Sequence, residues 1–566
     1  MALTYKPKLS ELTLREKIGQ TCQMQTAYLM NMEHLEEYLA ENPIGNVWHT
    51  CNTAMTTVNL ADIEIDGAQT SEVYRKWTQR MDTALRIPAL YGLDNPGSRH
   101  GTDLVDVIGV PVLGANDSEE VAEQYGRYLA MNARALGANW VWSPVVDLPT
   151  RFSGISIMRQ ISTRPDPLVE LSLAMIRGAQ SNGLAMSAKH FPGMDKIEYR
   201  DSHFADEIIR TGREDWFKEQ GKVFQDMIDG GVWSVMAGHQ AFPAVDNSRI
   251  NGGAYIPTTL SYKILTKLLK EEMGFKGVVV TDAIEMAALK TAYPDKEDLF
   301  VALLNAGNDV LLNVKRLDYV DIIERAVKDG RVSEARIDDA CQRILDMKEK
   351  MGLFAEKREE IVMTEDLRQE ILDFNTKAAE HALVLQCDKI NQIPLDPAKI
   401  KNVAIICSSH SDTFHKEMHV MQEEFERRGI KVHLQRRLTG YPEIEKIAAE
   451  NDLILYLHYV MPHIPMGGSG LFCEECAHFF FALHEGKEKS IGVSMGSPYV
   501  YYDYCSNMDT YIHAFSTTPA TQTAVVKALF GEIAFNGHYP YDEPWKDDEE
   551  ILRRYDNGTD LQTCII

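Results

Sequence analysis

The segment at residues 189–206, KHFPGMDKIEYRDSHFAD, places two histidines, two lysines and several carboxylates together directly after an apolar run. Within it, Asp201 and His203 stand two residues apart. A carboxylate that close to an imidazole can fix the tautomer of the ring and favour its protonated form. The pair could therefore move protons, although the same letters would also suit a simple surface turn.

Further polar residues stand at the ends of other apolar runs, namely Asp94, Asp147, Lys189, His190, His239 and Asp282. Taken singly, an aspartate after a strand is often the N-cap of the next helix, and a lone histidine is often structural. Packing gives no reason for charges at buried strand ends, where a desolvated, unpaired charge is costly. Their recurrence at equivalent positions therefore predicts one functional rim. Asp309, just before VLLN, is expected to be a cap or turn residue.

The elements that would position these groups are short apolar runs alternating with helical stretches from about residue 40 to 315. Such alternation predicts βα units around a parallel sheet. The runs are IGNVWHT, IPALYGLD, ANWVWSPVVD, LAMSAKHF, VWSVMAGH, GVVVTDA and NDVLLNV. Seven runs favour a (β/α)8 TIM-type barrel with one irregular unit, whose functional groups would lie at the carboxyl ends of its strands. A doubly wound sheet is the competing architecture.

A second domain is expected because the chain has 566 residues, too many for one hydrophobic core. We assign residues 1–355 to the catalytic barrel, 356–390 to a linker and docking segment, and 391–566 to a smaller α/β three-layer sandwich. The last assignment rests on the apolar runs NVAIICSS, IKVHLQRR, DLILYLHYV and SIGVSMGSP, which are separated by helical stretches.

Composition limits the partners and the compartment. The formal charge of −25 would repel nucleic acid and anionic lipid surfaces, so neither is expected as a partner. The amino-terminal segment lacks an apolar core and no apolar run approaches 18 residues, which favours a cytoplasmic protein. The nine cysteines include one close pair, CEEC at 473–476, and are expected to be reduced thiols. No metal and no cofactor are expected.

The motifs KHFPG, DSH, VMAGH, GVVVTDAIEM and NAGNDVLL, in this order and spacing, resemble the family 3 glycoside hydrolases. The Asp-x-His loop is most similar to their β-N-acetylglucosaminidase branch. The resemblance extends to LTLREKIGQTCQM, PALYGLDNPGSR, IGVSMGSPY and ATQTAVVKALFGEIAFNGHYP, and so covers nearly the whole chain. It implies a retaining, exo-acting β-glycosidase acting on a small carbohydrate.

The resemblance also implies roles for particular residues. Asp282 matches the nucleophile that forms a covalent glycosyl-enzyme. His203 matches the general acid/base, with Asp201 as its partner in a dyad. The positions expected to bind the substrate are Asp94, Arg159, Lys189, His190 and His239. Arg164 is a weaker substitute for Arg159, and Asp147 is expected to play a supporting part.

Two departures from the family pattern affect the expected substrate. MDKIEYR stands where this branch usually reads HGDTxx, which lengthens the loop by one residue. DNPGSR replaces DxEGGR, so a glutamate is lost and a proline stiffens the turn after Asp94. A β-linked N-acetylglucosaminide is the first expectation, and another β-glycoside is the alternative.

Other functions remain open from the sequence. A glycoside phosphorylase or transglycosylase would use the same site with another acceptor. A neutral histidine base does not repel phosphate, and Lys196 and Arg200 lie in the same loop. A zinc-dependent hydrolase would use His190, His203, His239 and Asp282 as ligands. A catalytically silent sugar-binding scaffold would keep the fold with the altered loop at 194–200.

Overall fold

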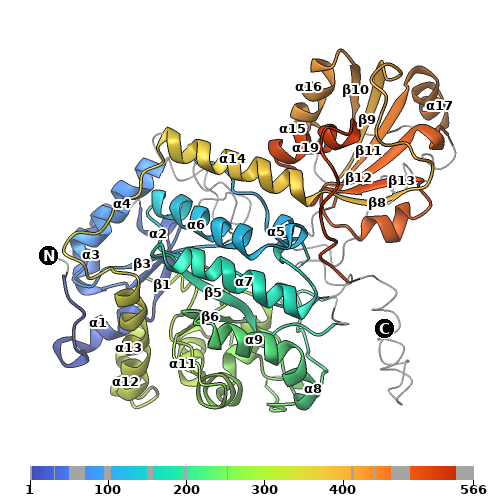
Figure 1. The fold of residues 1–566 in the computed structure, drawn as a ribbon. Coiled ribbons are helices and arrows are strands. Elements are labelled where there is room, and N and C mark those ends of the chain that lie inside the picture. Colours follow the sequence, from blue (N-terminus) through green and yellow to red (C-terminus); the bar gives the residue numbers. More distant parts are fainter. Residues whose placement is uncertain are drawn as a thin grey trace. The chain divides into compact units, whose positions relative to one another are not determined.

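The computed structural model describes residues 3–30, 32–49, 71–94, 104–149, 157–196, 198, 200–250, 253–409, 414–436, 438, 440–460 and 485–542. The chain divides into two compact units (Figure 1). Unit 1 comprises residues 1–107, 122–148 and 169–369, and unit 2 comprises residues 108–121, 149–168 and 370–566. The boundaries of a 1–355 barrel domain and a 356–390 linker stay a prediction.

Unit 1 is built on a seven-stranded parallel sheet whose strands follow one another in chain order. The strands are β1 (Gln23–Gln25), β2 (Asn46–Trp48), β3 (Leu90–Leu93), β4 (Trp140–Val141), β5 (Ala185–Phe191), β6 (Ser234–Ala237) and β7 (Val278–Thr281). Val310 bridges to Val280 of β7, and Leu311 bridges to Cys22 beside β1. These two bridges join the last strand to the first and confirm the TIM-type barrel.

Helices follow most of these strands, and the sequence marks several of their starts. Thr13 and Glu16 form a reciprocal capping box at α1 (Leu14–Gln20), and Asp295 caps α11 (Lys296–Ala306). The remaining helical segments that lie wholly in unit 1 are η1 (Leu9–Glu11), α2 (Thr26–Leu29), α3 (Leu35–Glu41), α4 (Ser71–Ala84), α8 (Arg213–Lys218), α9 (Gln220–Asp229), η5 (Thr258–Leu260), η6 (Lys263–Glu272), α10 (Ala287–Ala292), α12 (Tyr319–Lys328) and α13 (Glu334–Lys350).

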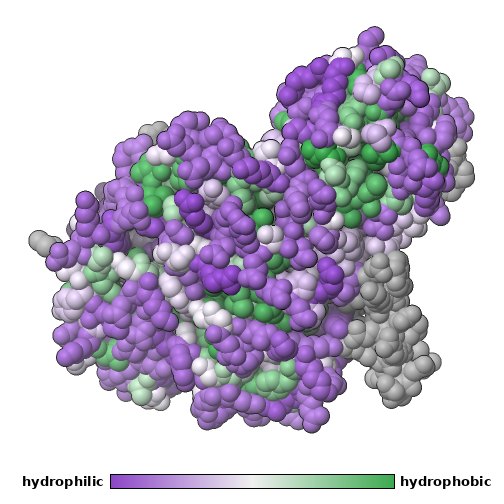
Figure 2. All heavy atoms as spheres, in the orientation of Figure 1, coloured by the Kyte–Doolittle hydropathy of each residue, from purple (hydrophilic) through white to green (hydrophobic). Residues whose placement is uncertain are grey.

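The barrel interior is closed by side chains from its strands and from the last helix. One buried cluster joins Leu90, Trp140, Met236 and Val278 to Met347 of α13. Because such interiors are packed to near crystal density, the barrel is a rigid support for groups at its strand ends. Polar side chains cover most of the face seen in Figure 2, in keeping with the high net charge.

Two strands differ from the sequence prediction. Six of the seven predicted runs contain barrel strands, but the run at 308–314 makes only the isolated bridges that close the barrel. Strand β1 was not predicted. Its sequence, QMQ, lacks β-branched residues, and its two glutamines are buried by neighbouring strands rather than by their own apolarity.

Unit 2 contains a six-stranded mixed sheet in the order β10-β9-β11-β12-β13-β8. Its strands are β8 (Val384–Asp388), β9 (Asn402–Ser409), β10 (Lys431–Gln435), β11 (Leu453–Tyr459), β12 (Ser490–Ser494) and β13 (Thr510–His513). All neighbours are parallel except β13 and β8. The helices are α5 (Val110–Asn116), η3 (Ile157–Arg159), α15 (Phe414–Glu417), α16 (His419–Arg427), α17 (Tyr441–Glu450), η7 (Lys487–Lys489), η8 (Tyr501–Cys505) and α19 (Pro519–Leu529).

Helices pack on both faces of this sheet, with α16 and α19 together on one side and α17 on the other (Figure 1). This arrangement confirms the predicted α/β sandwich. Three helices, α6 (Glu119–Ala135), α7 (Pro165–Gln180) and α14 (Glu365–Ala382), include residues of both units in their sequence.

Candidate active site at the carboxyl ends of the barrel strands

Several barrel strands are followed by polar residues at one end of the sheet. Asp94 directly follows β3, and Lys189 and His190 lie near the end of β5. His239 stands two residues after β6, and Asp282 directly follows β7. Because these strands are parallel, their carboxyl ends lie at the same edge, and the predicted residues are brought together there.

A buried ion pair joins β3 to β5. The Lys189 ammonium donates to Asp94 Oδ1 at 2.7 Å, and the lysine side chain is only 2% exposed. A lysine this deeply buried needs a carboxylate partner, since an uncompensated charge there costs several kcal/mol. The Asp94 carboxylate is 28% exposed and thus remains open to the outside of the barrel.

Strand β5 contains an irregularity at His190. Lys189 pairs with Met236 and Phe191 pairs with the next residue, Ala237, so His190 is one extra residue in the ladder. Such an extra residue redirects side chains from the usual alternation. His190 donates its backbone N–H to Asp147 Oδ1 at 2.9 Å, and its Nδ1 lies 2.8 Å from Asp147 Oδ2. Asp147 is fully buried and therefore orients the ring.

The Asp282 carboxylate faces this ring. Its Oδ2 lies 4.0 Å from His190 Nε2, and its side chain is 20% exposed. Burial alone would raise the pKa of Asp282, but the nearby His190, His239, His203 and Lys189 together lower it by more. The pKa of Asp282 is therefore lowered, and the carboxylate is ionised at neutral pH. An ionised, partly accessible carboxylate at a barrel strand end is equipped to act as a nucleophile.

His239 has a different environment from the one its position suggested. It is 1% exposed, its Nε2 lies 3.0 Å from the Ala283 carbonyl, and its Nδ1 lies 2.9 Å from Thr259 Oγ1. Both ring nitrogens are thus engaged, and burial lowers the pKa of His239 so that the ring stays neutral. The arrangement fixes the backbone next to Asp282. Thr259, on η5, gave no signal of this contact in the sequence.

Asp201 and His203 form a close pair in the loop after β5. Asp201 Oδ1 accepts the His203 backbone N–H at 2.9 Å and lies 2.7 Å from His203 Nδ1. The proton on Nδ1 is therefore held by the carboxylate, and Nε2 is the nitrogen left for transfer. The Ala287 N–H donates to the His203 carbonyl at 3.3 Å, which ties this loop to the segment that follows Asp282.

Three other positions named from the sequence remain to be described. Arg159 ends η3 and Arg164 precedes α7, both in unit 2, so the role of Arg159 at the rim stays a prediction. Asp309 is fully buried and pairs with Lys270 and Arg336 while accepting the Val279 N–H. Asp309 is thus part of an ion-pair network and not the simple cap expected for it.

The cations of the 194–200 loop are paired with carboxylates. Arg200 binds Glu198 through two hydrogen bonds, of 2.8 and 2.6 Å. Lys196 lies 3.4 Å from Glu219. Their charges are therefore largely compensated within the loop.

The donor set does not fit a zinc site. In the part of the chain that the structure describes, no group of three or more His, Cys, Asp or Glu side chains could hold a metal. His239, one of the four ligands that a zinc site would need here, uses both of its ring nitrogens in contacts with Thr259 and the Ala283 carbonyl. The CEEC pair lies outside the described residues.

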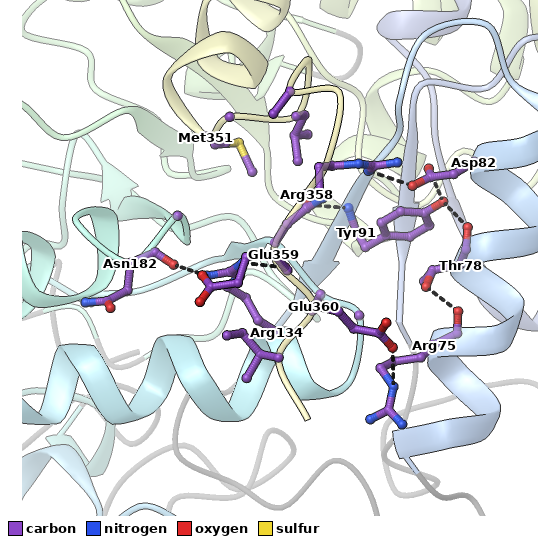
Figure 3. Close-up of a pocket in the computed structure, with 18 of the residues that line it drawn as sticks. Arg75, Thr78, Asp82, Tyr91, Arg134, Asn182, Met351, Arg358, Glu359 and Glu360 are labelled. Carbon is purple, nitrogen blue, oxygen red and sulfur yellow. Dashed lines mark hydrogen bonds and ion pairs between the residues drawn. The ribbon is translucent and has the colours of Figure 1, made fainter. Parts of the chain in front are cut away.

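A separate hollow lies at the opposite, amino ends of the strands. It has a volume of about 760 Å³ and lies between α4, the start of β3 and the segment 350–361. Figure 3 shows that its cations are matched to acids: Arg75 lies 3.5 Å from Glu360, and Arg358 lies 2.7 Å from Asp82. None of the predicted site residues lines this hollow. It is therefore distinct from the rim.

Residues 13–347 match the family described as glycosyl hydrolase family 3, N terminal domain. The matched region covers more than half of the chain and spans every barrel strand. The chain belongs to glycosyl hydrolase family 3.

Curated relatives of this family 3 chain are similar over part of their length. A β-N-acetylglucosaminidase/β-glucosidase of Cellulomonas fimi is 32% identical over 43% of this chain and 43% of its own. A β-hexosaminidase A of Pseudoalteromonas piscicida is 25% identical over 47% of this chain and 48% of its own. The matched region thus spans about half the length of these relatives.

Solved structures share the fold at greater coverage. A β-glucoside phosphorylase, BglX, superposes with a TM-score of 0.80 at 24% identity, covering 95% of this chain and 94% of the other. A family 3 β-N-acetylglucosaminidase from Paenibacillus sp. str. FPU-7 gives a TM-score of 0.78 at 23% identity, covering 94% and 99%. At this identity the likeness establishes the fold alone.

Among the described residues of this family 3 chain, no helix combines the length and apolarity needed to span a bilayer.

Proposed function

We propose that this protein is a retaining, exo-acting β-N-acetylglucosaminidase (β-N-acetylhexosaminidase) that works through a covalent glycosyl-aspartate. The observation that carries the proposal is the ionised Asp282 carboxylate, which faces His190 at the barrel rim in the same unit as the Asp201–His203 pair. The names of the partly matching relatives support the choice of sugar.

In the first step, Asp282 Oδ2 attacks the anomeric carbon and displaces the leaving group. His203, protonated on both nitrogens, donates the proton of Nε2 to the glycosidic oxygen as the bond to carbon breaks. Asp201 stabilises the imidazolium and keeps the remaining proton on Nδ1. The lowered pKa of Asp282 keeps the nucleophile charged for this attack.

In the second step, neutral His203 Nε2 removes a proton from water as the water oxygen attacks the anomeric carbon. The bond to Asp282 breaks and the carboxylate is regenerated. Two displacements at the same carbon return the original β configuration.

The substrate-binding roles follow from the remaining rim residues. Asp94 and Lys189 form a charged pair that can hold sugar hydroxyl groups by charge-assisted hydrogen bonds. His190, oriented by Asp147, faces the same space as the nucleophile. Arg159 is proposed as an additional sugar ligand. His239 is assigned to supporting the Ala283 carbonyl, because neither ring nitrogen remains for a sugar.

Water is the proposed acceptor. The phosphorylase alternative drew on the positive charges of Lys196 and Arg200, and the pairing of both with glutamates removes much of that attraction. A cytoplasmic location is also proposed. Cys22, Cys341, Cys387 and Cys407 are free thiols among the described residues, which supports a reducing compartment.

The test is a panel of aryl β-glycosides assayed with the wild type, Asp282→Ala and His203→Ala, each with and without phosphate. We expect hydrolysis of the N-acetylglucosaminide, loss of activity in Asp282→Ala, and rescue of that variant by azide with an α-configured product. A 2-fluoro sugar should label Asp282. Formation of a sugar 1-phosphate would replace water as the acceptor, and an inactive wild type without a covalent adduct would overturn the proposal.

A further inference from the structure

Glu207 is a buried carboxyl beneath the Asp201–His203 loop that the proposed mechanism does not use. It is 2% exposed, and its Oε1 accepts the backbone N–H of Ser202 at 2.9 Å. Ser202 is the residue between the two members of the dyad. Glu207 therefore holds the centre of the turn on which the proposed acid/base stands.

The backbone of Glu207 is fixed to the neighbouring strand end. The Ala241 N–H donates to the Glu207 carbonyl at 2.9 Å, and the Ile209 N–H donates to the Ala241 carbonyl at 2.8 Å. Ala241 lies two residues beyond His239, whose own contacts fix the backbone beside Asp282. The backbone on either side of the Glu207 side chain is therefore tied to the segment after β6.

Three buried acceptor oxygens in this region find no donor among the described residues. They are Glu207 Oε2, Asp201 Oδ2 and Gln240 Oε1. Buried acceptors without donors are costly, so native structures normally satisfy them. An ionised Glu207 would only add to the excess of acceptors, whereas a protonated Glu207 would supply an O–H donor.

The burial of Glu207 and the acidic groups near it also favour its protonated form. The titratable groups that face Glu207 are Glu198 and Asp201, both from its own loop. The side chain of Gln240, from the segment after β6, and the Ser202 N–H hydrogen-bond to Glu207 and act against the rise in its pKa, but burial outweighs them. Glu198 pairs with Arg200 and Arg210, and Asp201 pairs with His203, so these two acids add to the effect of burial and do not replace it. Burial, assisted by these two carboxylates, raises the pKa of Glu207 to about 8.

We propose that Glu207 is a positioning residue which, as a neutral carboxylic acid, holds the Asp201–His203 turn and donates a proton to the buried acceptors around it. The inference rests on the proposed function of that loop. It adds a requirement to that function: the site needs a proton on Glu207 as well as on the general acid. Ionisation of Glu207 would place a second buried negative charge beside Asp201 and displace the turn.

The experiment compares the wild type with Glu207→Gln and Glu207→Ala. Glutamine keeps the size and a donor but cannot ionise, so it should retain kcat/KM near neutral pH within about threefold, whereas alanine should lose at least about tenfold. At high pH the wild-type kcat/KM should fall with the loss of two protons, and Glu207→Gln with the loss of one. A merely structural residue would not change that slope.

Asp246→Asn is the matched control, because Asp246 is also buried and hydrogen-bonded but binds Ser261 and Lys263, away from the dyad. It should leave the slope unchanged. If Glu207→Gln keeps the wild-type slope, the inference is overturned.

A second readout does not depend on activity. The wild type should show an infrared band of a buried protonated carboxyl group near neutral pH, which disappears as the pH passes about 8 and is missing in Glu207→Gln. A wild type without this band would overturn the role of Glu207. A wild type with the band but without glycosidase activity would instead overturn the proposed function.

Discussion

The charged side chains at the two ends of the barrel are arranged differently: those at one end pair with each other, and those at the other end surround one accessible carboxylate. At the amino ends, Asp309 is enclosed by Lys270 and Arg336, and each charge lies against an opposite one. At the carboxyl ends, several residues lower the pKa of one carboxylate, Asp282, and His190 Nε2 lies 4.0 Å from it, beyond hydrogen-bond distance. The ion pairs at the amino ends hold structural elements together. The arrangement at the carboxyl ends leaves a charged group facing space that a ligand can enter.

The largest expected effect separates the two ends. Asp282→Asn should lower kcat/KM by at least about 10⁴-fold with little change in stability, because it removes the nucleophile and disturbs only a long ion pair of 4.0 Å with His190. Asp309→Asn should do the reverse. It should cost about 3–5 kcal/mol in the free energy of unfolding, since it leaves buried Lys270 without its main counter-charge, and should leave kcat/KM of the folded fraction nearly unchanged. Steady-state kinetics and denaturant titration measure both. Equal loss of activity in the two variants would contradict the contrast.

A smaller effect tests the proton donor. His203→Ala should lower kcat by about 10²–10⁴-fold for an aryl glycoside with a basic leaving group, and much less for one whose leaving phenol is acidic. The difference arises because only a basic leaving group needs a proton as the bond breaks. A plot of log kcat against the pKa of the leaving phenol should therefore be steep for the variant and shallow for the wild type. Parallel plots would remove His203 from the role.

The pH dependence sharpens the electrostatic part of the comparison. Because the pKa of Asp282 is lowered, the acid limb of wild-type kcat/KM should lie below the ordinary range for an aspartate. His190→Gln removes one source of positive potential, so the acid limb should move to higher pH by up to about one unit. The same substitution at His433, an exposed histidine of unit 2, serves as the control and should not move it. An acid limb that stays in place would show that His190 does not set the charge of Asp282.

A separate prediction concerns stability near Glu207. Its pKa is raised in the folded state, so the folded protein holds this proton more tightly than the unfolded chain does. The stabilisation is complete below the unfolded pKa of about 4.3 and is lost as the pH rises towards about 8, by at most about 1.4 kcal/mol per pH unit. Glu207→Gln should therefore gain stability relative to the wild type over this interval, as measured by denaturant titration at several pH values.

The sequence was most informative where a residue acts through its position along one strand. The carboxyl-end placement of Asp94, Lys189 and Asp282 followed from short apolar runs that end in charges, and the Asp201–His203 contact followed from a spacing of two residues. Such features need only local structure and the rule that parallel strands share a rim.

Contacts between distant segments could not be predicted in this way. The pair of Lys189 with Asp94 joins residues 95 positions apart, and the Thr259 contact that occupies His239 comes from a short helix 20 residues further along the chain. Glu207 gave a weak signal, an acid placed just before the apolar pair Ile208 and Ile209, which suggests burial but not a partner. Strand β1 was missed because its burial is imposed by neighbours rather than by its own residues.

The extra residue in β5 sets a constraint on the length of the chain as well as on its chemistry. Lys189 and His190 are adjacent, yet one pairs with Asp94 and the other with Asp147, and this depends on the one-residue step in register against β6. Deleting a single residue there would restore regular alternation and turn one of the two side chains towards the surrounding helices. Anyone who transplants this loop to change sugar preference must therefore preserve the number of residues up to Phe191, even where their identities are free to vary.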